Sequence, residues 1–386
     1  MKNNHEAYIL HTALSPVFHQ SPNSSTNNKN VSFQRMLPAI GRRQDGKLEY
    51  VMVPGISGNA RRSLARRDLI MDTLQILGIY REHQYNTNMV RSDLIMAFIN
   101  GGTMAASDSK LNPKIKAKQE TYEMLPFFGL FGGCYRQVWF GGRLSAGFAY
   151  LLTPEICRVA QIGPFPFDVE AEKLPDWDPE KKDFFNRQEY TRQRVPGLVS
   201  EDRLNALLLK LQEAGHLQIA EKIAEYSAET TEELREELKY LIEINPGAKE
   251  ILEKFFESKN TKKKKQKELV DQIPALFNNQ MIYAVDRPIP AGALLYASDY
   301  LLPGPGDDDL YEAVFHAYLE KLAARPFLGG MAAKGYGRTK IEVRNADGQS
   351  LEEFSRAKEY WTWLQDHKDE VCAYLKDYDS HLFVIK

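Results

Sequence analysis

The chain has 386 residues, which is enough for one large domain with insertions or for two smaller domains. Hydrophobic residues make up 43% of the sequence and aromatic residues 11%, so we expect a sizeable core and exclude disorder along the whole chain. The formal net charge of -2 by itself argues against a nucleic-acid partner. A net charge does not say where the charges lie, however, so a local basic surface remains compatible with it.

Cysteine usage and hydropathy indicate a cytoplasmic protein. Cys134, Cys157 and Cys372 are far apart and lack metal-ligand spacing, so we expect neither a disulfide framework nor a metal site. The N-terminal sequence has no long apolar run after a basic start, and nowhere do 18 apolar residues follow one another. We therefore expect no signal peptide, no membrane span and a cytoplasmic location.

The first fifth of the chain contains a strand, a polar loop and a strand–turn–helix unit. Residues 7–14 (AYILHTAL) are apolar and predict a strand. Residues 15–44 include the polar tract SPNSSTNNKN and predict a loop. The sequence LEYVMVPGISGNARRSLARRDLIMDTLQILGI then predicts a strand, a tight turn and a helix, which Ser57 or Asn59 caps. The apolar stripe of that helix is Leu64, Ile70, Leu74 and Leu77.

The middle of the chain is expected to contain insertions. Residues 80–124 are polar, with a helical stretch at PKIKAKQETYEML, and the glycine turns that follow lead into the strand pattern RLSAGFAYLL. Residues 160–198 are rich in proline and charge, with QEYTRQRV as an exposed strand. From 201 to 272 the pattern is helical and highly charged, which indicates a peripheral helical insertion.

Core-like sequence resumes in the last third. The sequence QMIYAVDRPIPAGALLYASDYLL predicts two strands around a turn, and DDDLYEAVFHAYLEKLAA predicts a helix. A glycine-rich loop then enters a last strand, and LEEFSRAKEYWTWLQDHKDEVCAYL predicts a C-terminal helix. This order fits an α+β core of the ferredoxin-like or RRM-like type, whose sheet is a common platform for single-stranded RNA.

Basic residues gather around the predicted start of the first helix. Residues 42–67 hold seven cations against the acids Asp45 and Glu49; the cations are Arg42, Arg43, Lys47, Arg61, Arg62, Arg66 and Arg67. Cations oppose the dipole at a helix N-terminus, and a bound phosphate would remove this conflict. Ser57, Asn59 and the helix arginines are therefore candidate phosphate contacts. The alternative is a solvated basic face, or pairing with Asp68 and Asp72.

Three further segments are candidate RNA contacts. The loop GGMAAKGYGR at 329–338 combines glycines with cations and a stacking ring; its candidate residues are Gly329, Gly330, Lys334, Gly335, Tyr336, Gly337 and Arg338. A plain tight turn explains this loop equally well. Arg136 lies in a glycine-rich stretch with Arg143, where turns with aromatic packing are the alternative. Arg192 and Arg194 alternate onto one strand face, where a charged edge is the alternative.

No arrangement of residues indicates catalysis. The eight histidines form no metal-ligand spacing, and His11 and His19 are either bases in an N-terminal loop or ordinary structural histidines. Asp45 lies in the turn sequence QDGK. The run of aspartates at 307–309 indicates helix capping rather than a metal site.

Two of these segments, in this order, resemble the CRISPR-associated RAMP superfamily. Its backbone subunits carry a strand followed by a proline–glycine turn and a helix, and later a GG-x-x-x-x-GYGR loop before the last core strand. Here the counterparts are PGISGNARR at 54–62 and GGMAAKGYGR at 329–338. LFGG and GRL, at 130–133 and 142–144, look like the central family signature. The resemblance covers about half of the chain, and residues 80–124 and 160–272 match nothing in the family.

The resemblance implies an RRM-like palm with inserted elements. The palm would consist of residues 1–79, 125–159 and 273–345. Residues 80–124 would form a finger-like insertion, 160–200 a thumb-like insertion, 201–272 a charged helical insertion and 346–386 a C-terminal helix.

The resemblance also implies a function. Type III relatives cleave target RNA with a loop aspartate, and because its only counterpart here, Asp45, lies beside a turn and in no recognisable motif, we expect neither a nuclease site nor a cofactor. Backbone subunits of the family line up head to tail along a CRISPR RNA, grip its backbone and leave its bases free to pair with target DNA or RNA in defence against viruses and plasmids. Expected partners are the crRNA, the target, further copies and other effector subunits including a helicase. The form of the first motif is closest to type IV subunits, with type I second. The alternative is a RAMP endoribonuclease that processes crRNA, with a tyrosine such as Tyr336 or a histidine as base, or one that cleaves target RNA.

Overall fold

The computed structural model describes residues 5–21, 31–102, 114–175, 188–193, 200–225, 232–256, 280–286 and 288–383. The chain divides into two compact units. The larger unit combines Met1–Arg187 with Val285–Lys386, and the smaller unit is Gln188–Ala284. Among the described residues, no helix has both the length and the apolar composition needed to cross a bilayer.

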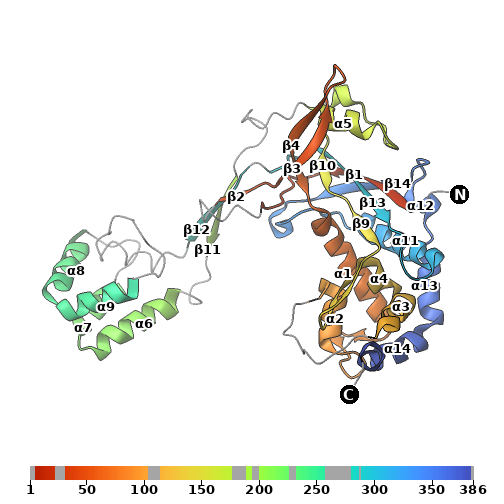
Figure 1. The fold of residues 1–386 in the computed structure, drawn as a ribbon. Coiled ribbons are helices and arrows are strands. Elements are labelled where there is room, and N and C mark those ends of the chain that lie inside the picture. The colour runs from red at the N-terminus through yellow and green to blue at the C-terminus, as the bar shows by residue number, and fades with distance from the viewer. Residues whose placement is uncertain are drawn as a thin grey trace. The chain divides into compact units, whose positions relative to one another are not determined.

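An antiparallel sheet organises the larger unit (Figure 1). Its strand order is β14-β1-β13-β10-β4-β3, and β9 also pairs with β13. The strands are β1 (Glu6–Ala13), β3 (Met36–Arg42), β4 (Leu48–Ile56), β9 (Leu144–Ala146), β10 (Ala149–Leu151), β13 (Leu294–Leu301) and β14 (Thr339–Arg344). The strand predicted at 7–14 is therefore an interior strand, paired with β13 on one side and with β14 on the other. Helices and antiparallel strands together make the chain an α+β protein.

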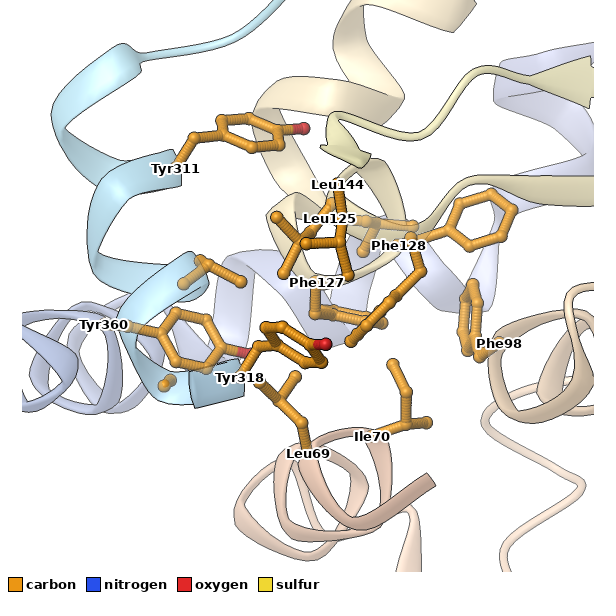
Figure 2. Close-up of a cluster of buried hydrophobic side chains, with 14 of the residues drawn as sticks. Leu69, Ile70, Phe98, Leu125, Phe127, Phe128, Leu144, Tyr311, Tyr318 and Tyr360 are labelled. Atoms are coloured by element: carbon orange, nitrogen blue, oxygen red, sulfur yellow. The ribbon is translucent and has the colours of Figure 1, made fainter. Parts of the chain in front are cut away.

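Helices cover one face of this sheet. They are α1 (Gly58–Ile76), α2 (Ser92–Asn100), α3 (Ile115–Met124), α4 (Pro126–Phe131) and α11 (Asp308–Ala324). Leu69 and Ile70 of α1 pack with Phe98 of α2, Phe127 of α4 and Tyr318 of α11 in one buried cluster (Figure 2). Because α2 and α3 contribute buried residues to this core, residues 80–124 are more than the polar insertion that their composition indicates.

The C-terminal segment is a series of short helices rather than one long helix. They are α12 (Leu351–Phe354), α13 (Ala357–Asp366), α14 (Lys368–Lys376) and α15 (Tyr378–Leu382). Tyr360 of α13 is fully buried, and its hydroxyl lies 2.8 Å from that of Thr73 in α1. Two small hairpins complete this side, β5 (Tyr80–Arg81) with β6 (Gln84–Tyr85) and β7 (Gly133–Tyr135) with β8 (Val138–Phe140).

The opposite face of the sheet is also covered. Helix α5 (Pro154–Ala160) and the turn η1 (Ala171–Lys173) lie on it, and Tyr8 and Leu10 of β1 are buried there. The rings of Tyr8 and Tyr296 stack at 6.4 Å, and Phe165 packs against Tyr296 at 5.1 Å. Since these rings are occupied by the protein itself, this part of the sheet face is not the open RNA platform that an RRM-like core predicts.

Strands β2 (Val31–Phe33) and β3 lie within residues 15–44, which the sequence indicates to be a loop. β3 pairs with β4 along its whole length, from Met36 opposite Pro54 to Arg42 opposite Leu48. The proline and glycine in MLPAIGR do not favour a strand by sequence. β3 is nevertheless the end strand of the sheet, where a proline is tolerated.

The described residues of the smaller unit form two strands and a helical bundle. The strands are β11 (Gln188–Gln193) and β12 (Gln280–Asp286), which pair with each other. The helices are α6 (Ser200–Glu213), α7 (Leu217–Glu225), α8 (Glu232–Ile244) and α9 (Pro246–Phe256). Apolar residues at helical spacing, such as Leu207 with Leu211 and Leu238 with Ile242, form a core of its own.

Candidate nucleic-acid interface

The start of α1 is a capped helix N-terminus without acids. Ser57 is extended, and its Oγ accepts a hydrogen bond from Ala60 N at 3.3 Å. The first turn holds no Asp or Glu, and Asn59 is exposed while Arg62 is half-buried. The free N–H groups of this turn and the cation beside it suit an anion. The prediction of Ser57 as the cap is confirmed.

Arg61 is a structural residue and does not reach solvent. It is 2% exposed, and its guanidinium donates to Asp299 Oδ1 at 2.8 Å, to Asp299 Oδ2 at 3.3 Å and to Gly147 O at 2.7 Å. Tyr318 also donates to Asp299 Oδ2, at 2.8 Å. Burial by itself lowers the pKa of Arg61, but the Asp299 carboxylate outweighs it and leaves the pKa raised. The expected phosphate contact by Arg61 is therefore corrected to a buried ion pair.

Arg66 is also turned into the protein. Its Nε donates to Phe98 O at 2.7 Å and its terminal nitrogen to Ala97 O at 3.0 Å, so it caps the carbonyls at the end of α2. Its guanidinium lies 5.3 Å from the centre of the Phe131 ring. Burial lowers its pKa to about 10. The expectation that Arg66 joins Arg62 on an RNA-facing surface is corrected for this reason.

Arg62 and Arg67 are the helix arginines that remain available. Arg67 is exposed, and neither residue forms an ion pair within the described ranges. The alternative pairing with acids of the same helix does not occur, because Asp68 pairs with Arg325 and Asp72 pairs with Lys321. Two of the four arginines of this helix start are thus free to meet an anion.

The glycine loop is fastened to the chain that leaves β1. Gly330 N donates to Phe18 O at 2.8 Å, and Gly337 N donates to Pro16 O at 2.8 Å. Arg338 N donates to Ser15 Oγ at 2.9 Å. Gly337 has φ +80, and a Cβ there would lie 2.3 Å from Leu328 O. Gly329 has φ +82, with a Cβ 2.4 Å from Phe18 O, so these glycines allow close approach of protein backbone.

The tip of the same loop is open. Lys334 ends the turn η3 (Ala332–Lys334), and Lys334, Gly335 and Arg338 are exposed. Gly335 has φ +84, and no atom lies within 4 Å of the place a Cβ would take. Tyr336 is 2% exposed, so its expected role as a stacking ring is wrong. The loop therefore offers cations and bare backbone to a ligand, without an aromatic face from Tyr336.

The segment from Ser15 to His19 joins the two predicted segments. At one end it holds the glycine loop through the bonds described above. At the other end His19 Nε2 lies 3.2 Å from Ser57 Oγ. The buried side chain of Gln34 accepts from His19 N at 3.0 Å and donates to Gly55 O at 3.3 Å, which ties this segment to the turn before α1. The loop at 329–338 and the helix start at 57 thus share one support.

His19 and Arg35 lie beside the start of α1, although no sequence pattern singles them out as phosphate contacts. Arg35 N donates to His19 O at 2.7 Å, and both side chains are half-buried. Burial lowers the pKa of His19, and the charge of Arg35 acts in the same direction. An anion bound here would reverse that effect, because it would favour the protonated imidazole.

The remaining candidates lie elsewhere or outside the described residues. Arg136 pairs with Asp379 at 2.9 Å and with Asp93 at 3.4 Å, so its expected RNA contact is corrected to an ion-pair cluster among helices. Arg143 is buried and bonds Leu302 O at 2.9 Å, in keeping with the packing alternative. Arg192 lies in β11, where only the backbone is described, and Arg194 lies outside the described residues.

The two acidic candidates have structural roles. Asp45 is exposed in the β3–β4 turn, where its carboxylate accepts from Lys47 N at 3.1 Å. Asp307 caps α11 by accepting from Asp309 N at 2.9 Å and Leu310 N at 3.3 Å, as predicted. Within the ranges that the structure describes, no group of three or more His, Cys, Asp or Glu side chains is arranged to hold a metal ion.

No family model and no curated protein matches the chain. Solved structures that resemble it include a chain of a type IV-B CRISPR complex, with 15% identity and a TM-score of 0.41 over 88% of this chain and 90% of the other. Csc2 of Thermofilum pendens has 13% identity and a TM-score of 0.29, covering 98% and 82%. Oligomeric Cmr4 from Pyrococcus furiosus has 12% identity and a TM-score of 0.29, covering 89% and 99%. A type IV-B CRISPR complex is thus among the solved structures that this chain resembles.

Proposed function

We propose that this chain is a non-catalytic RAMP-type backbone subunit of a CRISPR ribonucleoprotein, closest to type IV, which polymerises along the crRNA and presents it for pairing with a target. The observation that carries this proposal is the shared support of the glycine loop and the α1 N-terminus by Ser15–His19. It ties the loop that carries the exposed Lys334 and Arg338 to the helix start that carries Arg62. Such a surface suits a phosphate chain and reads no bases.

The sheet order supports an RRM-like palm. Without the β3–β4 hairpin, the strand order is β14-β1-β13-β10. The first core strand, β1, thus lies between the third, β13, and the fourth, β14, and β10 is the second. This is the arrangement of a β-α-β-β-α-β core. The covered face around Tyr8 fits a subunit that holds the RNA backbone at the loop side rather than stacking bases on the sheet.

Binding to single-stranded RNA tests the proposal. Replacing Arg62 and Arg338 together by Ala should weaken binding to all sequences alike and make the dependence of log K on log salt shallower by about 0.7 for each phosphate that the variant no longer neutralises. Lys173→Ala with Lys254→Ala removes two exposed cations that already pair with Glu170 and Glu250, and so matches the change in net charge. Equal affinities and salt slopes for the two double variants would refute the proposal.

The endoribonuclease alternative has one observation in its favour. His19 lies at the interface, bonded to Ser57 Oγ, and its lowered pKa keeps the imidazole neutral and able to accept a proton. Tyr336, the other candidate base, is buried. Cleavage of repeat RNA without metal by the wild type, and its loss in His19→Gln with unchanged RNA affinity, would establish this alternative in place of the non-catalytic role.

A further inference from the structure

The β3–β4 hairpin has a covered face and an uncovered face. On the covered face, Val53 is buried with Ile156 of α5, and a Cβ on Gly41 would meet Glu155. The other face carries large apolar side chains in cross-strand pairs, with Pro38 opposite Met52 and Ile40 opposite Tyr50. Their exposed fractions are 50% for Ile40, 64% for Leu48, 68% for Tyr50 and 46% for Met52.

This outer face has the properties of a docking surface. Single exposed apolar residues are ordinary, but a contiguous patch on an edge hairpin marks an interaction site. β3 is the end strand of the sheet. The turn and the strand ends beside it carry three exposed cations, Arg42, Arg43 and Lys47, against the acids Asp45 and Glu49, and Lys47 lies 3.7 Å from Asp45. The partner should therefore present apolar side chains among carboxylates.

Helix α8 presents such a surface. Positions three and four apart share one side of a helix, and this side of α8 is exposed. It carries Tyr240, 62% exposed, and Ile244, 52% exposed. Around them are four exposed carboxylates: Glu233, Glu236, Glu237 and Glu243. Glu237 pairs with Lys222 of α7 at 3.1 Å, and the other three of these carboxylates lie outside that pair.

We propose that the outer face of the β3–β4 hairpin of one copy binds the acidic, apolar side of α8 in the next copy. Tyr50 and Ile40 would meet Tyr240 and Ile244 at the centre, where aromatic anchors contribute most, and the cations of the turn would meet the carboxylates at the rim. Because the two surfaces differ, the contact is heterologous, and repeating it from copy to copy builds an open chain unless the rotation closes a ring. This inference rests on the polymerising role in the proposed function and names the surfaces that would produce it.

Two variants test the contact in sedimentation velocity without RNA. One lacks the hairpin anchors (Tyr50→Ser, Met52→Ser), and the other lacks the α8 anchors (Tyr240→Ser, Ile244→Ser). Wild-type protein should form species of increasing size as its concentration rises. Each variant alone should associate at least about tenfold more weakly. An equimolar mixture should form dimers and stop there, because only one pair of intact surfaces remains.

The controls separate the possible failures. Trp139→Ser with Ile162→Ser removes two apolar residues that are 65% and 64% exposed, and should leave association unchanged. Circular dichroism verifies that each variant folds. A second experiment exchanges the charges of the two surfaces: a copy with Arg43→Glu and Lys47→Glu should associate with a copy that carries Glu236→Lys and Glu243→Lys. A wild type that stays monomeric, or a mixture without dimers, would overturn the proposal.

Binding to a short single-stranded RNA separates this inference from the proposed function. Both anchor variants should bind it as the wild type does. Loss of RNA affinity in the hairpin variant, with association intact, would mean that the outer face binds nucleic acid, and would refute the contact between copies. No RNA binding by the wild type, with dimers in the mixture, would refute the proposed function alone.

Discussion

The imidazole of His19 lies 3.2 Å from the hydroxyl of Ser57, and this contact fixes the exit of the first strand to the cap of the first long helix. The cap itself holds Ala60 N, so the position of the helix start depends on residues almost forty positions earlier in the chain. Through Phe18 O, the same segment also determines where the glycine loop lies. The candidate interface is thus a property of the tertiary structure and not of either motif alone.

Arg62 and Arg66 should behave oppositely when each is replaced. Arg62→Ala should weaken RNA binding and reduce its salt slope, because Arg62 has no ion pair within the described residues, and should leave stability nearly unchanged. Arg66→Ala should instead lower the free energy of unfolding by about 1–3 kcal/mol, because it leaves the carbonyl of Phe98 without its donor and removes one of the two donors to Ala97 O. Filter binding across salt concentrations and urea denaturation measure the two effects. Similar loss of salt slope in both variants would contradict the burial of Arg66.

Removing one partner of the buried pair of Arg61 and Asp299 should destabilise the protein strongly, because the other partner is then left buried and unpaired. Asp299→Asn leaves a buried guanidinium without its carboxylate and should lower the free energy of unfolding by about 3–5 kcal/mol. Replacing both residues by Leu should be less damaging than the sum of the single changes, which a double-mutant cycle in urea would reveal. Strict additivity would show that the two side chains do not act as a pair.

His11 should make the protein less stable in mild acid. Burial lowers its pKa well below the usual range, with Arg61 acting in the same direction, and neither ring nitrogen has a hydrogen-bond partner among the described residues. The folded state therefore keeps His11 neutral, while the unfolded chain takes up a proton below about pH 6.5. The free energy of unfolding should fall as the pH drops below that value, by up to about 1.4 kcal/mol per pH unit.

His11→Leu should remove most of this acid dependence. Urea denaturation between about pH 7.5 and about pH 5 measures it, with the exposed His83→Gln as the control for the loss of an imidazole. An unchanged slope in His11→Leu would mean that another group causes the acid destabilisation. His19, whose pKa is also lowered, is the first to replace in that case.

Two glycines of the same loop should differ in their effect on RNA binding without any change of charge. Gly337→Ala places a Cβ 2.3 Å from Leu328 O and should displace the loop from Pro16, which weakens RNA binding. Gly335→Ala meets no atom within 4 Å and should lower stability by about 1 kcal/mol, from its positive φ alone. Equal RNA affinities in the two variants would show that the attachment of the loop does not matter for binding.

Sequence patterns correctly predicted the helices and strands whose ends and apolar spacing are set by neighbouring residues in the chain. The helix from Asp308 to Ala324 follows from its apolar spacing and its aspartate cap, and the strand–turn–helix around Ser57 follows from the turn and the cap. The hairpin strand at 36–42 was missed because its proline, glycine and exposed residues do not alternate like a buried strand. The C-terminal helix was expected as one piece and is broken into four.

The candidate site also depends on contacts between distant parts of the chain, which sequence patterns do not reveal. The sequence marks the arginines of the helix start, but the partner of Arg61 lies 238 positions away and those of Arg66 are backbone carbonyls, which no pattern reveals. Tyr336 was expected to stack on bases because a tyrosine in a glycine loop is usually exposed, yet it is buried. Exposure separates RNA contacts from structural residues here, and exposure is set by the fold.

The segment from Ser15 to His19 should make the two halves of the candidate interface open as a single cooperative unit. Local opening of this segment would release the loop at 329–338 and the helix cap at 57 together. Because linkage between binding and opening is reciprocal, a ligand held by one half slows hydrogen exchange at the other, although about 270 residues of chain separate them. The amides of Gly330, Gly337 and Ala60 should therefore exchange with one common rate, and that rate should fall together when RNA binds.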